Sequence, residues 1–167
     1  MASNEVHHFS SLEEMTGEAD LIVEGEVERV ERGREFGQPG IARVYFVTAY
    51  IRLERTYAGT APGKEVPLEI FVGDGSGVEP FIEGFPGTRG LWFLFQKDAE
   101  AKRLGTMVEG LGFYMLVSSQ GLVAEVNGTA ENAFGEESDD PDSVFASTDG
   151  RAFSAVADEV RELANQP

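Results

Sequence analysis

Apolar and polar side chains alternate at period two in residues 19–33, "ADLIVEGEVERVERG". Apolar residues and one glycine form one face and mainly glutamates form the other: Leu21, Val23, Gly25 and Val27 against Ile22, Glu24, Glu26 and Glu28. This alternation predicts a half-buried β-strand. Gly25 predicts a bulge or a tight bend within it.

Five further apolar stretches also predict strands. They cover residues 41–57, 66–72, 91–96, 113–117 and 122–126. The first of them carries large side chains on both faces near its start, so we expect another element to cover its outer face. Pro67 cannot donate to a strand ladder, which places it at an edge or at a strand start. Trp92 lies in the most apolar stretch and is expected in the core.

Helical patterns occur near both ends of the chain. Ser10 or Ser11 can cap a short helix that ends near Gly17. Near the C-terminus, four apolar residues have helical spacing after a capping Thr148 or Asp149: Phe153, Val156, Val160 and Leu163. This amphipathic helix needs a partner surface, and the outer face at Phe46 and Tyr50 is the predicted one.

The order of these elements indicates one mainly β domain over residues 1–167. A small antiparallel barrel over about 19–127 is the natural arrangement for meandering strands between two helices. An acidic connection over about 128–146 then leads to the C-terminal helix at about 149–164. No internal repeat or second-domain linker interrupts this pattern.

The charge balance changes the range of expected partners. Thirty acidic residues against thirteen basic residues give a net charge of −17. Such a surface repels phosphate backbones and anionic lipids, so we expect neither nucleic-acid binding nor direct membrane insertion. The chain has no cysteine, which excludes disulfides, zinc–thiolate sites and thiol nucleophiles. Its first ten residues lack the basic and apolar regions of a signal peptide, and none is expected there.

Several blocks of the sequence resemble a widespread class of exported bacterial domains. They are "SLEEMTGEADLIVEGEVERVE", "YFVTAYIRLERTYAGTAPGKEVPLEIFV", "GTRGLWFLF", "MLVSSQGLVAEVNG" and "FSAVADEVREL". Their plan is also similar to the OB-like barrel of netrin-like and tissue-inhibitor-of-metalloproteinase domains. The resemblance covers about four fifths of the chain and implies an OB-like barrel, an exported or cell-envelope location and a protein-binding role. The cysteines with which that inhibitor family chelates zinc are absent here, so no functional residue carries over.

A long loop over residues 73–90, "GDGSGVEPFIEGFPGTRG", is the most suggestive segment for binding. Its glycines lack the spacing of a phosphate-binding loop, and no helical pattern is expected after them. Phe81, Ile82 and Phe85 either fold back to close one end of the barrel or form an exposed binding patch. We expect them to be the partner-binding residues, with residues 97–110 as a second contact loop.

The glutamate row on the first strand admits three interpretations. Glu24, Glu26 and Glu28 are spaced by about 6.6–6.8 Å, because a strand rises about 3.3 Å per residue. They form a solvated face paired with Arg29, Arg52 or Arg55, a cation site, or an acid–base pair. Catalysis needs a desolvated carboxylate, and the neighbours here are charged, so the paired face is the favoured interpretation.

A metal site has one candidate segment, "EESDDPDS" at residues 136–143. The carboxylates that could gather calcium there are Glu136, Asp139, Asp140 and Asp142. A solvated loop is the alternative interpretation of such a charge block. His7 and His8 are adjacent and point apart on an extended chain, so they suit a shared metal poorly. No other cofactor is expected.

Together these patterns predict a non-enzymatic protein-binding or assembly module that uses barrel-end loops. The expected partner is a protein with a basic patch, or a second copy of the chain. A calcium-dependent surface module and, less favoured, a carboxylate-only hydrolase are the alternatives. The hydrolase requires a concave pocket with two carboxylates in different environments.

Overall fold

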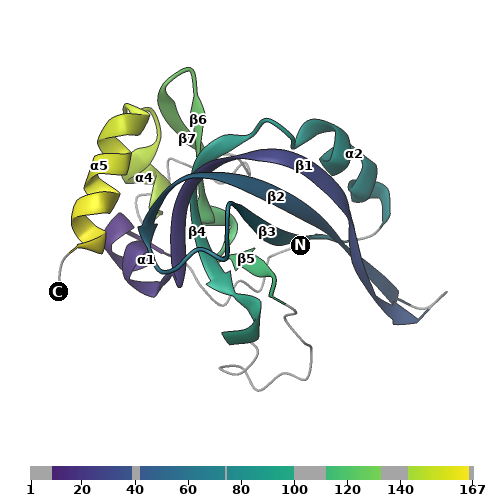
Figure 1. The fold of residues 1–167 in the computed structure, drawn as a ribbon. Helices are drawn as coiled ribbons and strands as arrows, with labels where there is room; N and C mark the ends of the chain where they lie inside the picture. The colour runs from purple at the N-terminus through teal and green to yellow at the C-terminus, as the bar shows by residue number, and fades with distance from the viewer. Residues whose placement is uncertain (1–8, 39–41, 74, 100–111, 133–142, 166–167) are drawn as a thin grey trace.

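The alternating stretch near the N-terminus forms the first part of a long strand, β1 (Leu21–Gln38), in the computed structural model of the protein (Figure 1). The structure describes residues 9–38, 42–73, 75–99, 112–132 and 143–165. The other strands are β2 (Ala42–Ala58), β3 (Glu65–Gly73), β4 (Arg89–Gln96), β5 (Tyr114–Leu116), β6 (Leu122–Val126) and β7 (Thr129–Asn132). The described helices are α1 (Leu12–Glu18), α2 (Val78–Gly84), α4 (Phe145–Thr148) and α5 (Phe153–Ala164), with short 3₁₀ turns η1 (Gly75–Gly77) and η2 (Ser119–Gly121). The fold is therefore mainly β, as predicted.

The strands form one mixed sheet in the order β1-β2-β3-β5-β4-β6-β7. β1 also pairs with β4, so the pairings among β1, β2, β3, β5 and β4 lead back to β1. The prediction of an entirely antiparallel sheet is wrong at one place, because β3 and β5 run parallel where Leu68 faces Tyr114. A parallel neighbour needs a long connection, and here α2 and β4 lie between the two strands in sequence.

The pairing of β1 with β2 is irregular at Gly25, where a bulge or tight bend is predicted, but the extra residue, Glu54, lies on β2. The register between β1 and β2 shifts between Glu24 and Gly25. A Cβ atom at Gly25 would lie 2.3 Å from the carbonyl oxygen of Arg52, so only glycine fits this close approach. The Trp92 indole donates a hydrogen bond to the Gly25 carbonyl at 3.0 Å. This irregular part of β1 is thus tied to the buried strand β4.

One group of apolar side chains, the inner core, lies between the curved strands. It includes the predicted inward residues of β1 together with side chains from β2, β3, β4 and β6: Leu21, Val23, Val27, Val47, Ala49, Ile51, Val66, Leu68, Trp92, Leu94 and Leu122. Trp92 is fully buried, as expected. Because side chains alternate along a strand, the residues between these positions face the other side of the sheet.

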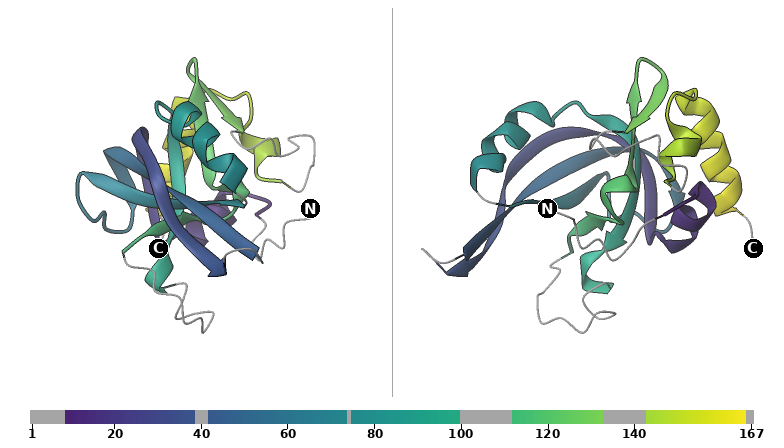
Figure 2. Two further views of the ribbon diagram at one scale, coloured as in Figure 1. Left: turned by 90° about the vertical axis from the view of Figure 1, so that its right-hand side faces the viewer. Right: turned by 180° about the vertical axis from the view of Figure 1, so that it is seen from behind.

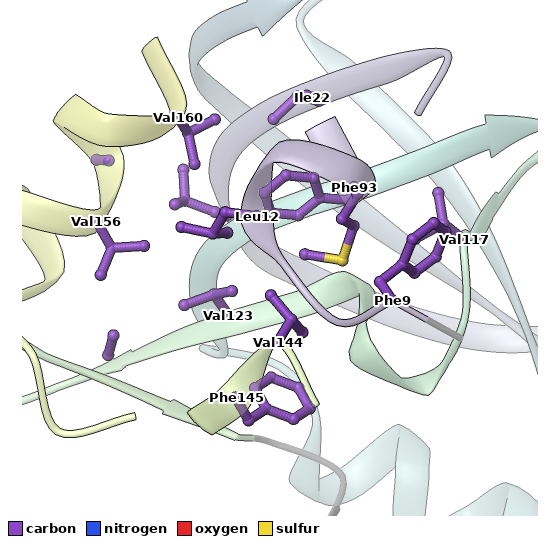
Figure 3. Packing of buried hydrophobic residues seen from close by; sticks show 14 of the residues in the cluster. Phe9, Leu12, Ile22, Phe93, Val117, Val123, Val144, Phe145, Val156 and Val160 are labelled. Carbon is purple, nitrogen blue, oxygen red and sulfur yellow. The ribbon is translucent and has the colours of Figure 1, made fainter. Parts of the chain in front are cut away.

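A second group, the helix-covered core, lies on the outer side of β1, β4 and β6. Figure 3 shows Ile22, Phe93 and Val123 from the strands packed against Val144, which precedes α4, and against side chains of the helices, which include Leu12, Phe145, Val156 and Val160. α1, α4 and α5 gather at this end of the molecule, whereas α2 lies at the other end (Figure 2). None of the described helices is long and apolar enough to cross a lipid bilayer.

The predicted partner surface of the C-terminal helix is therefore wrong. α5 packs on α1, on β2 and on β7, and its apolar side chains share one core with Ile22, Leu91 and Phe93, a core that does not include Phe46 and Tyr50. The reason is the apolar character of the outer surface of β1 and β4, where Ile22 lies in line with the glutamates but is fully buried. That surface offers Ile22, Leu91 and Phe93, none of which keeps any exposed area.

Two segments predicted as loops contain regular structure. The 73–90 loop contains η1 and α2, so the expectation that no helix follows its glycines is wrong. The predicted acidic connection at 128–146 contains β7 and begins α4. Asn127 and Gly128 both have positive φ, 53° and 81°, which fits the tight turn between β6 and β7.

Candidate functional site

The predicted partner-binding residues lie on α2 and directly after it. Phe81, Ile82 and Phe85 are partly buried and pack against the inner core. The Phe85 ring meets Trp92 edge-on at 6.0 Å and lies 5.2 Å from the Phe81 ring. This packing supports the first predicted role, closure of one end of the fold. A direct role in partner binding stays a prediction for these residues.

The other predicted site segments are only partly described. Glu136, Asp139, Asp140 and Asp142 lie outside the described residues, and so does most of the 97–110 segment. Within the described residues, no group of three or more histidine or carboxylate side chains is arranged to hold a metal ion. The calcium prediction is therefore neither supported nor contradicted.

The glutamate row on β1 is paired with arginines. Arg52 lies 3.5 Å from Glu26 and 3.7 Å from Glu28, as the paired interpretation expects. Glu24 has a partner that the sequence did not indicate, Arg89 at the start of β4. The glutamate row is thus an ion-paired face, in which Glu26 and Glu28 pair with Arg52 and Glu24 pairs with Arg89.

Arg89 is the centre of a cluster of three carboxylates. Its guanidinium bonds Glu24, and it reaches Glu54 at 2.8 Å and Glu125 at 2.7 Å. Its planar group also lies 5.6 Å from the Phe153 ring of α5. Arginine can serve several acceptors in this way because its five N–H donors fan out in a plane. The cluster ties β1, β2, β4 and β6 together beside α5.

A pocket of about 280 Å³ opens next to this cluster. Its lining mixes both charges with two aromatic rings: Glu24, Arg55, Tyr57, Glu125, Gly128, Phe153, Ser154, Ala157, Asp158 and Arg161. Glu24 and Glu125 both face the same guanidinium, so neither carboxylate lies in the apolar setting that a general acid requires. This geometry gives the hydrolase alternative little support.

The pKa of Tyr57, which lines the pocket, depends on its burial and on its contact with Glu24. Burial raises the pKa of its phenol, and a 2.6 Å hydrogen bond donated to Glu24 raises it further. We expect Tyr57 to deprotonate above the ordinary value of about 10. The difference in absorbance at 295 nm between wild type and Tyr57→Phe, followed during alkaline titration, measures this.

The control for that titration is Glu24→Gln, which keeps an acceptor but removes the negative charge. The pKa of Tyr57 should fall in this variant, because the charge of Glu24 no longer raises it, whereas burial still raises it and Arg55 still lowers it. A wild-type Tyr57 that deprotonates at or below the ordinary value contradicts the described contact.

A second surface, the aromatic face, lies on the outer side of β1, β2 and β3. It consists of Phe36, Phe46 and Phe71, whose rings meet edge-on with Phe46 in the middle, 5.6 Å from each neighbour. Phe46 and Phe71 are cross-strand partners in the β2–β3 register. Phe71 is 56% exposed, which is the largest exposure of any large apolar side chain in the described residues.

A buried ion network lies beside the aromatic face. The Glu69 side chain has no exposed surface. Arg34 donates to both of its oxygens, Nε to Oε2 at 2.7 Å and Nη2 to Oε1 at 2.6 Å, and Lys97 bonds Oε1 as well. The cations also contact aromatic rings, since Lys97 lies over Phe46 at 4.4 Å and Arg34 over Phe36 at 5.2 Å.

The contacts in this network shift the pKa values of Glu69 and Lys97. Burial opposes ionisation of Glu69, but the hydrogen bonds from Arg34 and Lys97 outweigh it, so the pKa of Glu69 lies below its ordinary value. Burial lowers the pKa of Lys97, and its bond to Glu69 offsets only part of that. The two partners differ because the carboxylate has two cations, whereas the ammonium has one carboxylate and a repelling Arg34 nearby.

Sequence reasoning missed the aromatic face, although signals for it exist. The sequence predicts Phe46 beneath the C-terminal helix, and the alternation in "VPLEIFV" places Phe71 on the outward side of its strand. Glu69 is the single charge in that apolar stretch and marks an outward position that needs a partner. Its partners lie 35 and 28 residues away, and no local pattern identifies them.

Comparison with known proteins assigns no family to the chain. No protein-family model matches it, and no curated protein is significantly similar to it in sequence. Its function must therefore be inferred from the residues and contacts described above.

Proposed function

We propose that this protein is a non-enzymatic protein-binding module whose contact surface is the aromatic face. The observation that carries the proposal is Phe71, an aromatic side chain that is 56% exposed and continues into a cluster of rings. Exposed apolar patches of this kind mark interaction sites more often than isolated apolar residues do. Aromatic and arginine side chains together are typical of the energetic centre of protein interfaces.

The proposed architecture is an OB-like barrel. Three features support it: the strand pairings that lead back from β4 to β1, the parallel β3–β5 pair, and the position of α2 between β3 and β4. In OB-folds the outer face of the second and third strands is a common binding surface. The aromatic face occupies that position, and this part of the support is an analogy between folds.

A protein is a better partner for this face than a nucleic acid. The chain has a net charge of −17, which opposes the approach of a polyphosphate. The ion pairs around the face bring its local charge close to zero, because Arg29 pairs with Glu65 while Arg34 and Lys97 pair with Glu69. Near-neutral aromatic patches are typical of the centre of a protein interface.

This proposal keeps the predicted class of function and moves the main contact surface. Phe81 and Phe85 are partly buried against Trp92 and the inner core, so much of their apolar area is already used by the fold. Phe71 contributes less to the packing of the fold, because more than half of its surface is exposed. It is the better single anchor for a partner.

The proposal predicts that Phe71→Ser strongly weakens ligand binding without unfolding the protein. A random peptide library displayed on phage, selected against the wild-type protein, should yield enriched peptides. These peptides should lose at least about tenfold in affinity for the variant, because a central aromatic anchor contributes about 2 kcal/mol or more. The thermal midpoint of Phe71→Ser should stay close to that of wild type, since substitutions at exposed positions change stability by about 0.5 kcal/mol or less.

The matched control is Val126→Ser, which removes an apolar side chain that is 44% exposed on the β6–β7 hairpin. Binding of the selected peptides should survive this change. The proposal is wrong if the selection enriches no peptide, or if the enriched peptides bind Phe71→Ser as tightly as wild type.

A further inference from the structure

We infer that the pocket beside Arg89 binds a small zwitterion of the amino-acid class, whose carboxylate contacts Arg55 and whose ammonium group contacts Glu125. Both side chains line the pocket, and none of the phenylalanines of the aromatic face does. The inference therefore goes beyond the proposed function and does not rest on it. It depends on the hydrogen-bonding capacity that the fold leaves unused on these two side chains.

Arg55 is the one arginine of the described residues that forms no salt bridge. The others there each pair with at least one carboxylate: Arg29, Arg32, Arg34, Arg43, Arg52, Arg89, Arg151 and Arg161. Glu24 faces Arg55 across the β1–β2 register, but its two oxygens already accept from Tyr57 and Arg89. An exposed guanidinium without a carboxylate can bind the carboxylate of a ligand through two parallel N–H donors.

Glu125 offers the complementary charge. Its Oε2 accepts from Arg89 at 2.7 Å, whereas its Oε1 has no hydrogen-bond partner among the described residues. The side chain is 31% exposed, so a ligand in the pocket can reach this oxygen. An ammonium group brings three N–H donors and a positive charge, which suits a carboxylate oxygen that still accepts.

The opposite signs of these two groups select a ligand that carries both charges. The other charged groups that line the pocket are compensated within the protein, as the pairs Glu24–Arg89 and Asp158–Arg161. The neighbouring strands β2, β1, β4 and β6 place Arg55 and Glu125 on opposite sides of the site. A ligand with only an anionic group would face Glu125, and one with only a cationic group would face Arg55.

The size and the walls of the pocket suit a molecule as small as an amino acid. Its volume of about 280 Å³ lies just below the usual range for small-molecule sites, about 300–1,000 Å³. Phe153 and Ala157 of α5 and the ring of Tyr57 add apolar contacts for the rest of the ligand. The Phe153 amide donates to the Gly128 carbonyl at 2.9 Å, which fixes α5 against the β6–β7 hairpin beside it (Figure 1).

The experiment tests each of the standard L-α-amino acids at about 10 mM for a rise in the thermal midpoint, because a ligand bound only by the native state stabilises it. Binding is then followed by ¹H–¹⁵N correlation spectra, in which the amides of Gly128, Ser154 and Ala157 should shift. For an amino acid that binds, the analogue without its amino group and the analogue without its carboxylate should each bind at least about tenfold more weakly.

Arg55→Met should weaken binding of the amino acid at least about tenfold and should leave the affinity of the amine analogue no lower than in wild type. Arg55 is exposed and takes part in no salt bridge, so this variant should keep the fold. The matched control is Lys64→Met, which removes an exposed cation that does not line the pocket. This control should bind the amino acid as wild type does.

Three results would overturn the inference: no amino acid shifts the pocket amides, a singly charged analogue binds as tightly as the amino acid, or Arg55→Met binds like wild type. If Arg55→Met does not fold, the analogue titrations on wild-type protein decide. Phe71→Ser should bind the amino acid as tightly as wild type does, because Phe71 does not line the pocket. Failure of this inference therefore leaves the proposed function standing, and the reverse also holds.

Discussion

Replacing Glu69 by glutamine is expected to lower the free energy of unfolding by about 3 kcal/mol. Breaking a buried ion pair by removing one partner typically costs about 3–5 kcal/mol, because the remaining charge stays buried without compensation. The lower end applies here because Arg34 and Lys97 each keep some exposed surface and can turn toward water. Small domains have a total stability of about 5–15 kcal/mol, so a urea titration should show a clearly lower midpoint.

The matched control for Glu69→Gln is Glu65→Gln on the same strand. Glu65 also receives two hydrogen bonds from one arginine, Arg29, but its side chain is 34% exposed and that of Arg29 is 48% exposed. Water can replace this pair, so the change in the urea midpoint should be much smaller. Equal effects of the two substitutions would show that burial of Glu69 does not set the strength of its network.

The effect of Glu69→Gln should depend on pH in a defined direction. The pKa of Glu69 is lowered in the folded protein, so its contribution to stability is fully present above the unfolded value of about 4.3. Below that value the unfolded chain takes up the proton first, and the contribution is lost as pH falls through the folded pKa. The difference in stability between wild type and variant should be constant from neutral pH to about 5 and should narrow below about 4.3.

Strand positions in this fold could be predicted from the sequence because the strands obey local rules. The period-two pattern of β1, the irregular pairing at Gly25 and the burial of Trp92 all follow from neighbouring residues. The helix α2 also had a local signal, since Val78, Phe81, Ile82 and Phe85 have helical spacing and Pro80 lies in the first turn, where proline is tolerated. The glycines and prolines around this segment favour a loop, and they mask the helical spacing in the sequence.

The packing of elements could be predicted less well, because it depends on which apolar surfaces compete for the same helix. Ile22 occupies the face of β1 that carries Glu24, and only its neighbours in α1 and α5 reveal that it is buried. The same limit holds for the candidate site. Glu24 meets Arg89 across 65 residues and Glu69 meets Arg34 across 35, and strand register rather than sequence spacing brings them together.

Gln120→Leu is expected to destabilise the protein by about 1–3 kcal/mol, the cost of a buried polar group that loses a hydrogen-bond partner. The Phe9 carbonyl still accepts from the Val144 N–H at 3.0 Å in this variant. The Gln120 side chain is 1% exposed and joins three distant segments. Its Oε1 accepts from the Phe9 amide at 2.7 Å, and its Nε2 donates to the Phe9 carbonyl at 2.9 Å and to Ser143 Oγ at 3.2 Å. Leucine has a similar size but can make none of these bonds.

The amide of Gln120 thus holds the chain at Phe9 in place much as a strand partner would, and this predicts where Gln120→Leu loosens the fold. Hydrogen exchange should accelerate first at Phe9 and α1, before the inner core opens, because local contacts fail at lower free energy than the whole domain. Gln96→Leu is the matched control, since Gln96 is exposed and its side chain makes a long 3.4 Å hydrogen bond to Tyr114. Uniform acceleration across the sheet would show instead that Gln120 supports the whole domain.

Gln120→Glu tests the two hydrogen bonds to Phe9 separately. A carboxylate still accepts from the Phe9 amide but cannot donate to the Phe9 carbonyl. Burial should raise the pKa of that carboxyl, so Gln120→Glu should regain part of its stability as pH falls and the protonated group donates again.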